Sequence, residues 1–119
     1  MPDPSASAPD CLFCKIVAGE VPATLVREGE RTLAFRDVDP KAPTHVLVIP
    51  RAHHNDVGAL AAADPAALAE LVREASAVAL DDGHDAYRLV FNSGAGAGQS
   101  VFHVHGHVLA GRALSWPPG

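Results

Sequence analysis

The chain has 119 residues, a formal net charge of −5 at pH 7 and two cysteines. A chain of this length forms one domain and can bury a hydrophobic core without disulfides. The acidic balance argues against a nucleic-acid-binding surface, and no apolar stretch is long enough to span a membrane. Residues 1–10 are rich in Pro, Ser and Ala and lack the features of a signal peptide. We therefore expect a disordered tail over residues 1–10, a single domain over residues 11–119 and a cytoplasmic location.

The first half of the domain predicts one short helix and three strands. Residues 13–18 are typical of a short helix that ends at a glycine. Residues 24–28 and 31–36 are separated by a short turn and predict a β-hairpin. The β-branched run over residues 45–49 is typical of a central strand.

One long helix is predicted from Pro65 to Leu80. Asp64 is a favourable N-cap, Pro65 suits the first helical position, and Gly83 supplies the stop. Apolar residues recur at helical spacing and form a stripe that faces the core. This predicted stripe comprises Leu68, Leu71, Val72, Ala75, Val78 and Ala79.

Two further strands, over residues 86–92 and 101–109, flank a glycine-rich loop. Strands thus outnumber helices, and the first connections are short. The sequence therefore predicts an α+β domain whose antiparallel sheet has about five strands, with one long and one short helix.

Three histidines alternate with apolar or small residues in the last predicted strand: His103, His105 and His107. A strand with a period of two puts the three imidazoles on one face, with Phe102 and Val104 on the other. Three interpretations are open. The row has no functional role, it binds a metal, or one neutral imidazole attacks a substrate.

The loop over residues 92–100 precedes these histidines and contains three glycines. Glycine lets the backbone approach a ligand closely, and successive amides can bind an anion. A phosphate held by this loop would lie within reach of an imidazole. The combination favours catalysis at phosphorus.

Cys11 and Cys14 have the spacing of half a zinc site. They are too close in sequence for an ordinary structural disulfide. Two unconnected reduced cysteines and a redox pair are the alternatives to a metal site.

Residues 98–108 resemble the His-x-His-x-His signature of the histidine-triad (HIT) family. The similarity continues through residues 33–38, 42–50 and 116–119. Together these segments resemble the branch of the family formed by purine nucleoside phosphoramidases, and the resemblance covers residues 11–119.

This resemblance implies a HIT-like fold that forms a homodimer, in which the paired sheets make one larger continuous sheet. It also implies hydrolysis of adenosine or guanosine 5'-phosphoramidates to a nucleoside monophosphate and an amine, through a covalent nucleotidyl-histidine. His105 is the implied nucleophile, and the backbone carbonyl of His103 fixes its tautomer. The other implied catalytic residues are His107, His45 and Ser100.

The resemblance implies a purine nucleotide pocket as well. Asp37 matches the residue that binds the ribose hydroxyls, for which a carboxylate is a good acceptor. Asn92, Gly98 and Ser100 match positions at the phosphate, and Trp116 is expected near the partner's active site. The candidates for the apolar slot around the base, equally consistent with ordinary core, are Phe13, Phe35, Val38 and Leu47.

For the cysteines, the resemblance implies a structural Zn²⁺ held by Cys11, Cys14, His53 and His103. Catalysis itself requires no cofactor. His54 adjoins His53, so the choice between these two ligands stays open.

Two other functions stay open: hydrolysis of dinucleoside polyphosphates, and a nucleotide-binding interaction protein whose hydrolysis is incidental.

Two residues also depart from the family pattern. Arg36 precedes the expected ribose-binding aspartate, so we expect altered base or ribose contacts. Gly106 replaces a bulkier residue, so we expect an effect on packing.

Overall fold

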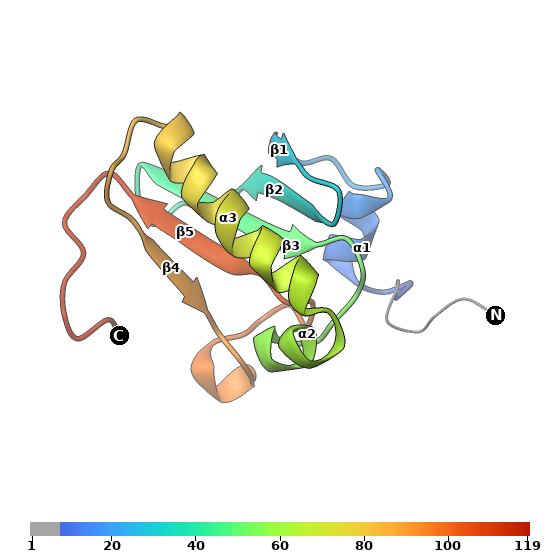
Figure 1. The fold of residues 1–119 in the computed structure, drawn as a ribbon. Coiled ribbons are helices and arrows are strands. Elements are labelled where there is room, and N and C mark those ends of the chain that lie inside the picture. The colour runs from blue at the N-terminus through green and yellow to red at the C-terminus, as the bar shows by residue number, and fades with distance from the viewer. Residues whose placement is uncertain (1–7) are drawn as a thin grey trace.

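A computed structural model describes residues 8–119 and shows a sheet covered by helices (Figure 1). Residues 1–7, which make up most of the expected disordered tail, lie outside the described residues. Immediately after them, the Cys11 amide donates to the Ala8 carbonyl at 3.1 Å. Residue 8 therefore contacts the start of the first helix.

The sheet has five strands in the order β1-β2-β3-β5-β4, and every neighbouring pair is antiparallel. The predicted α+β class and strand number are confirmed. The strands are β1 (Leu25–Glu28), β2 (Thr32–Arg36), β3 (Thr44–Pro50), β4 (Arg88–Phe91) and β5 (Gly106–Ala110).

Within residues 8–119, three α-helices accompany the sheet: α1 (Leu12–Val17), α2 (Val57–Ala63) and α3 (Pro65–Asp81). Helix α2 was not predicted, so the expected count of one long and one short helix is wrong. Asp56 caps it, because the Ala59 amide donates to the Asp56 carboxylate at 2.9 Å. None of the helices in residues 8–119 has the length and apolar character needed to cross a bilayer.

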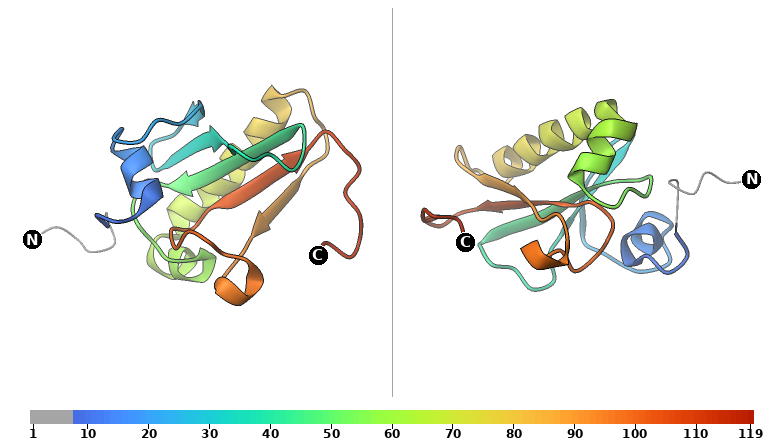
Figure 2. Two further views of the ribbon diagram at one scale, coloured as in Figure 1. Left: turned by 180° about the vertical axis from the view of Figure 1, so that it is seen from behind. Right: turned by 90° about the horizontal axis from the view of Figure 1, so that it is seen from below.

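Helix α3 covers one face of the sheet, and Figure 2 (right) shows it on that side alone. Asp64 caps it as predicted, accepting from the Ala67 amide at 3.1 Å. Its stripe packs against Val46, Val48 and Val108 of the sheet. Val72 does not belong to the stripe, since it is 43% exposed. The buried residues of α3 are Ala67, Leu71, Ala75, Val78 and Ala79.

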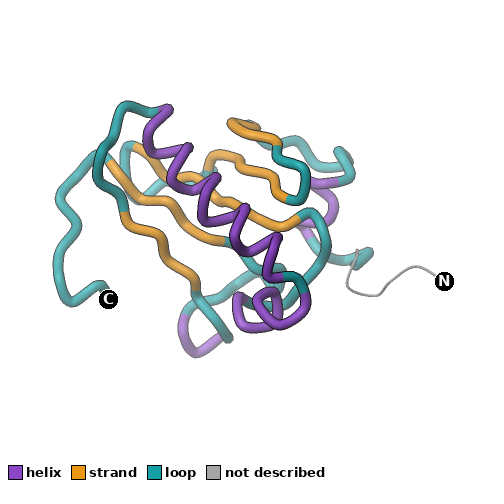
Figure 3. Tube along the Cα trace, in the orientation of Figure 1, coloured by secondary structure: helices purple, strands orange, loops and turns teal. Residues whose placement is uncertain are grey.

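The other face of the sheet carries a second apolar cluster beneath α1, and the rest of this face is free of helices in the described chain (Figures 2 and 3). Strand β3 alternates between the two clusters, so it is buried on both sides. Phe35 pairs with Leu47, and Leu47 pairs with His107. His107 therefore lies on the face opposite α3. The cluster comprises Phe13, Leu33, Phe35, Leu47 and Ile49.

The histidine-rich segment forms a strand only from Gly106 onward. The predicted strand over residues 101–109 is therefore wrong in its first half, where the Val104 amide bonds to the His54 carbonyl at 2.8 Å. Val104 is buried as expected, but Phe102 is 46% exposed. This departure from strand geometry sets the directions of the His103 and His105 imidazoles.

Candidate active site and metal centre

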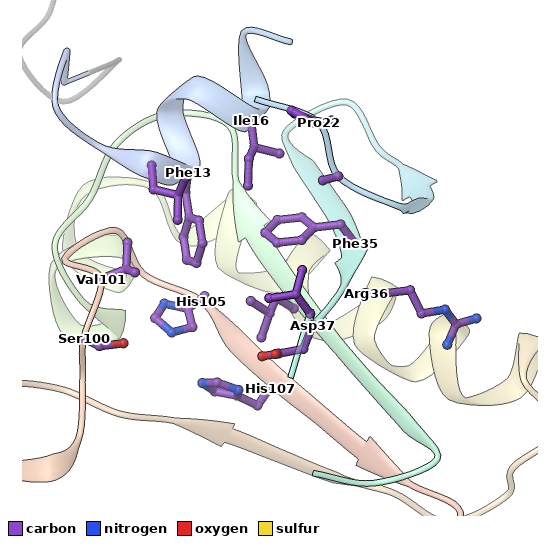
Figure 4. Close-up of a pocket in the computed structure, with 14 residues that line it drawn as sticks. Phe13, Ile16, Pro22, Phe35, Arg36, Asp37, Ser100, Val101, His105 and His107 are labelled. Atoms are coloured by element: carbon purple, nitrogen blue, oxygen red, sulfur yellow. The ribbon is translucent and has the colours of Figure 1, made fainter. Parts of the chain in front are cut away.

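A cavity of about 240 Å³ opens on the face opposite α3 (Figure 4). It lies between α1, the strands β2 and β3, and the segment that carries His105. Seven of the predicted site residues line it with their side chains inside or at the mouth, and an eighth, Val38, is fully exposed at its rim. The seven are Phe13, Phe35, Asp37, Leu47, Ser100, His105 and His107.

Sequence reasoning missed several apolar residues of this cavity. Leu12 and Ile16 come from α1; the sequence predicted only a short helix over residues 13–18, which includes Ile16 but not Leu12. Pro22 and Ala23 come from the loop before β1, where no pattern signals a pocket. The further lining residues are Leu12, Ile16, Pro22, Ala23, Arg36 and Val101.

The His105 ring lies between Phe13 and His107 in this cavity (Figure 4). Its Nδ1 is 2.9 Å from the His103 backbone carbonyl. A carbonyl only accepts hydrogen bonds, so Nδ1 carries the proton and Nε2 keeps its lone pair. Burial lowers the pKa of His105, which keeps the ring neutral. His105 thus presents an unprotonated nitrogen on the cavity side of a fixed ring.

A chain of hydrogen bonds fixes the protons on His45 and His107. The Lys41 amide donates to His45 Nδ1 at 3.0 Å, so the proton of neutral His45 lies on Nε2. His45 Nε2 is 2.9 Å from His107 Nδ1 and donates to it. The remaining proton of His107 therefore lies on Nε2, available to a ligand. Burial lowers the pKa of His107 to about 4 and that of His45 below its usual value, which keeps both rings neutral.

Asp37 stands beside this chain. One of its carboxylate oxygens accepts from the Asp39 amide at 2.8 Å, and the other lies 3.4 Å from His45 Nε2. A second cavity of about 320 Å³ adjoins this carboxylate and is also lined by His107 and Asn92. Asn92 therefore belongs to the same face as the other predicted residues, one cavity away from the apolar slot.

The glycine-rich loop is held in place by Gln99, a residue that sequence reasoning missed. Gln99 is 4% exposed; its carbonyl oxygen accepts from the Gly94 amide, and its amide donates to the Asn55 and Val101 carbonyls. Gly94 and Gly98 adopt φ values of +91° and +95°, which only glycine adopts without strain. The fixed loop delivers Ser100 to the cavity. No local pattern distinguishes a buried glutamine of this kind from an exposed one.

The three triad imidazoles do not face one common space, as the predicted row required. His105 and His107 are neighbours, with ring centroids 4.9 Å apart. His103 is 0% exposed and turns instead toward the two cysteines. The residues before β5 leave the strand, so their side chains no longer alternate between two faces.

A second cluster gathers Cys11, Cys14, His53 and His103, with one ligand atom of each within 4.8 Å of all the others. Sulfur–nitrogen distances are 3.4 Å for Cys11–His103, 3.4 Å for Cys14–His53 and 3.5 Å for Cys14–His103. Zinc bonds of about 2.3 Å to sulfur and 2.0 Å to nitrogen at tetrahedral angles separate the two atoms by about 3.5 Å. These residues fit a tetrahedral zinc ion.

The surroundings of the cluster also suit a metal. His103 Nε2 lies 2.8 Å from the Pro50 carbonyl, which leaves Nδ1 unprotonated toward the sulfurs. The Cys14 amide donates to Cys11 Sγ, and the Ala8 amide donates to Cys14 Sγ. Burial raises the pKa of the Cys14 thiol, a cost that a bound cation would offset. His53 Nδ1, and no atom of His54, belongs to the set.

Asp37, His45 and His107 form another group with metal-ligand atoms close together. His45 already accepts a hydrogen bond at Nδ1 and needs its proton on Nε2. A metal at Nε2 would require an imidazolate, so this group suits proton placement better than metal binding.

Of the two departures from the family pattern, Arg36 forms an ion pair and Gly106 avoids a steric clash, so the expectation that Arg36 alters base or ribose contacts is wrong for its guanidinium. Arg36 points away from the cavity (Figure 4) and donates to both oxygens of Asp82, at 2.6 and 3.0 Å. The Thr44 hydroxyl also donates to Asp82, and these contacts lower the pKa of Asp82 to about 2. At Gly106, a Cβ atom would lie 2.8 Å from the Leu89 side chain.

Trp116 lies outside both cavities, and its side chain is 81% exposed. The site of a single chain is therefore built without this residue.

Comparison with known proteins identifies the family. The HIT domain matches residues 18–114, and the chain belongs to this family. An uncharacterised HIT-like protein of Synechocystis is 49% identical over 113 residues, which cover 94% of this chain and 99% of that protein. A 14 kDa zinc-binding protein of Zea mays is 46% identical over 112 residues, 91% of this chain and 87% of that protein.

Solved structures share the fold. A HIT family hydrolase from Legionella pneumophila superposes with a TM-score of 0.88 at 47% identity, covering 92% of this chain and all of the other. A zinc-bound histidine triad family protein from Mycobacterium smegmatis has a TM-score of 0.75 at 33% identity, covering 87% of this chain and 76% of the other.

Proposed function

We propose that the protein is a purine nucleoside phosphoramidase, a hydrolase that cleaves the P–N bond of adenosine or guanosine 5'-phosphoramidates. The observation that carries this proposal is the His105 ring, whose Nδ1 is bound to the His103 carbonyl at 2.9 Å while Nε2 is free beside the cavity. A similar protein from Legionella pneumophila is described as a HIT family hydrolase, which supports hydrolytic chemistry.

The reaction proceeds in two displacements. His105 Nε2 attacks the α-phosphorus, and the bond to the amine nitrogen breaks with its electron pair leaving on nitrogen. The departing amine takes a proton from the Ser100 hydroxyl, while His107 Nε2 keeps its proton and donates a hydrogen bond to the phosphate. Water then attacks the nucleotidyl-histidine, releasing the nucleoside monophosphate and neutral His105, and its proton restores the group that protonated the amine.

The remaining residues bind the nucleotide. Phe13, Phe35 and Leu47 form an apolar slot for a purine, and Val38 covers its open rim. Asp37 accepts hydrogen bonds from the ribose hydroxyls. The phosphate lies against the glycine-rich loop, near Gly98, Ser100 and Asn92, and accepts from His107 Nε2.

We propose that Cys11, Cys14, His53 and His103 hold a structural zinc ion. Their distances fit a tetrahedron, and similar proteins from Zea mays and Mycobacterium smegmatis are described as zinc-binding or zinc-bound. When bound, the ion crosslinks α1 to the segment before β5 and takes no part in the displacement.

We further propose a homodimer. Strand β4 is an edge of the sheet with unpaired backbone groups, and the C-terminal tail runs beside it (Figure 1). Pairing two such edges makes one continuous sheet. It would also cover the exposed Trp116 at the neighbouring site, where the ring can shape the leaving-group pocket.

The test is His105→Asn, assayed with adenosine 5'-phosphoramidate. The asparagine retains a group that can bond the His103 carbonyl but is not a nucleophile. We expect kcat to fall by about 10³-fold or more, with AMP affinity and the unfolding midpoint close to those of the parent. Turnover at the parental rate would contradict the proposal. Faster hydrolysis of a dinucleoside polyphosphate than of the phosphoramidate would replace the proposed substrate class.

A further inference from the structure

We propose that the zinc-ligand cluster (Cys11, Cys14, His53, His103) is a positioning device for the nucleophile, so that metal binding sets both the orientation of His105 and the shape of the base slot. This inference rests on the proposed function for the role of His105. It assigns the cluster a task beyond stabilising the fold.

The first connection runs through the backbone of His103. Its Nδ1 faces the sulfurs of both cysteines, and its Nε2 is bound to the Pro50 carbonyl at 2.8 Å. Two contacts thus clamp the ring from opposite sides. The carbonyl of the same residue accepts from His105 Nδ1 at 2.9 Å. The residue that ligates the metal therefore also selects the tautomer of the nucleophile.

The second connection runs through Phe13, which lies between the two cysteines in sequence. Its ring is edge-on to the imidazoles of His105 and His103, with distances between ring centroids of 5.0 and 5.9 Å, respectively. Cys11 caps α1, accepting from the Cys14 amide at 3.3 Å. With six residues, α1 is too short to be stable alone, so anchoring of the cysteines fixes the phenyl ring over the nucleophile.

Outside the cluster, the segment 101–105 is held by hydrogen bonds that join the Val101 carbonyl to Gln99 and His103 Nε2 to the Pro50 carbonyl. It forms no strand, and Val104 contributes its amide to the His54 carbonyl. By contrast, the core beneath α3 contains no residue of α1, and of the segment 101–105 it takes Val104 alone. Loss of the metal should therefore loosen the nucleophile and the base slot while the sheet and α3 stay folded. This separation makes a positional role distinguishable from a global one.

The experiment compares the full chain loaded with zinc, stripped by a chelator, and reloaded. Imidazole ¹⁵N NMR reports the tautomer of His105, amide hydrogen exchange reports local order, and AMP binding reports the slot. In the stripped protein we expect the His105 Nδ1–H signal to give way to a tautomer mixture and exchange to rise in residues 11–17 and 101–105. AMP affinity should fall about tenfold or more, since small misplacements of site groups carry large penalties. Reloading should reverse all three changes.

Two variants provide a matched pair. His53→Asn removes a ligand that, unlike His103, makes no backbone hydrogen bond to His105. This variant should reproduce the stripped state. His54→Asn changes the adjacent histidine, whose side chain is outside the cluster, and should leave tautomer and affinity unchanged.

Three results would overturn the inference: an unchanged His105 tautomer and AMP affinity in the stripped protein, loss of exchange protection throughout α3, or equal effects of the two variants. Failure of the proposed function would look different. The metal would still control the His105 tautomer, but the loaded protein would not cleave the phosphoramidate.

Discussion

Two clusters that contain histidines lie beside His105: the zinc-ligand cluster and the pair His45–His107. They differ in the backbone group to which one ring nitrogen is hydrogen-bonded. In the cysteine-containing cluster, His103 directs Nε2 to the Pro50 carbonyl and leaves Nδ1 unprotonated among sulfurs. In the other cluster, His45 accepts from the Lys41 amide at Nδ1, so Nε2 is protonated and donates to His107. A carbonyl partner thus leaves a nitrogen free to bind a metal, and an amide partner leaves an N–H that donates a hydrogen bond.

His105 combines features of both clusters. It has a carbonyl partner, like His103, and therefore a free lone pair. That lone pair faces a cavity rather than two thiols. The difference between a metal ligand and a nucleophile therefore lies in what the unprotonated nitrogen faces, since both rings are buried and neutral.

The largest expected effect is on zinc content, which should depend on the zinc-ligand cluster and not on His45 or His107. The parent should hold about one zinc ion per chain, in tetrahedral coordination. His53→Asn should lower zinc affinity by at least about 100-fold, because even loss of a group that only hydrogen-bonds a ligand costs 10–100-fold. His45→Asn should retain the full zinc content. Loss of zinc in the His45 variant would place the metal in the wrong cluster.

Catalysis should show the opposite dependence. His107→Gln removes the Nε2 proton that the hydrogen-bond chain presents to the substrate. We expect kcat to fall by about 10²–10³-fold, the range for a lost hydrogen-bond donor to the transition-state oxygens, with zinc content unchanged. Steady-state kinetics with a phosphoramidate check this result. A rise in KM alone, at unchanged kcat, would reduce His107 to a binding role.

Much of this contrast could be predicted from sequence, but the direction of the side chains could not. The period-two pattern predicted one row of imidazoles, from His103, His105 and His107, on a continuous strand. In the structure the strand begins only at Gly106, because the His103 ring contacts Cys11 and Cys14, about 90 residues away in sequence. The alternation of residues within one segment carries no information about a contact with residues so distant in sequence.

Gln99 and α2 illustrate the same limit. Gln99 acts through contacts to backbone atoms on both sides of the loop and at Asn55, which no spacing rule encodes. Helix α2 is an alanine-rich stretch containing Gly58, so its helical signal is weak without the Asp56 cap. Conversely, α3 carries a strong helical period and β3 a continuous β-branched run, and both were predicted to within one or two residues.

A smaller effect is expected at Asp82, which binds Arg36 and Thr44, the residue next to His45. Arg36 and Thr44 lower the pKa of Asp82 from 3.8 to about 2. Asp82→Asn should reduce the free energy of unfolding at pH 7 by at most about 2 kcal/mol. Because the folded-state pKa is depressed, this stabilisation is present above pH 4 and is lost as the pH falls toward 2. Urea unfolding at pH 7 and at low pH measures it, and a variant equally destabilised at both would contradict the linkage.

The pH dependence of catalysis gives the smallest expected shift. Burial lowers the pKa of His105 below its usual value of 6.5, and lowers that of His107 to about 4. The neutral forms therefore persist into mildly acidic solution. The acid limb of kcat/KM should have its midpoint below pH 6.5 in the free enzyme. A midpoint at or above 6.5 would mean that the catalytic imidazole is solvated or paired with an anion.

The identity of the attacking atom is tested most directly by trapping the intermediate. The protein is mixed with adenosine 5'-phosphoramidate, quenched within one turnover, digested and mapped by mass spectrometry under conditions that preserve phosphorus–nitrogen bonds. The account predicts an added adenylyl group on His105, formed and lost at rates compatible with turnover. An adenylyl group on a different residue, or full-rate turnover with no adduct and inversion of configuration at phosphorus, would contradict it.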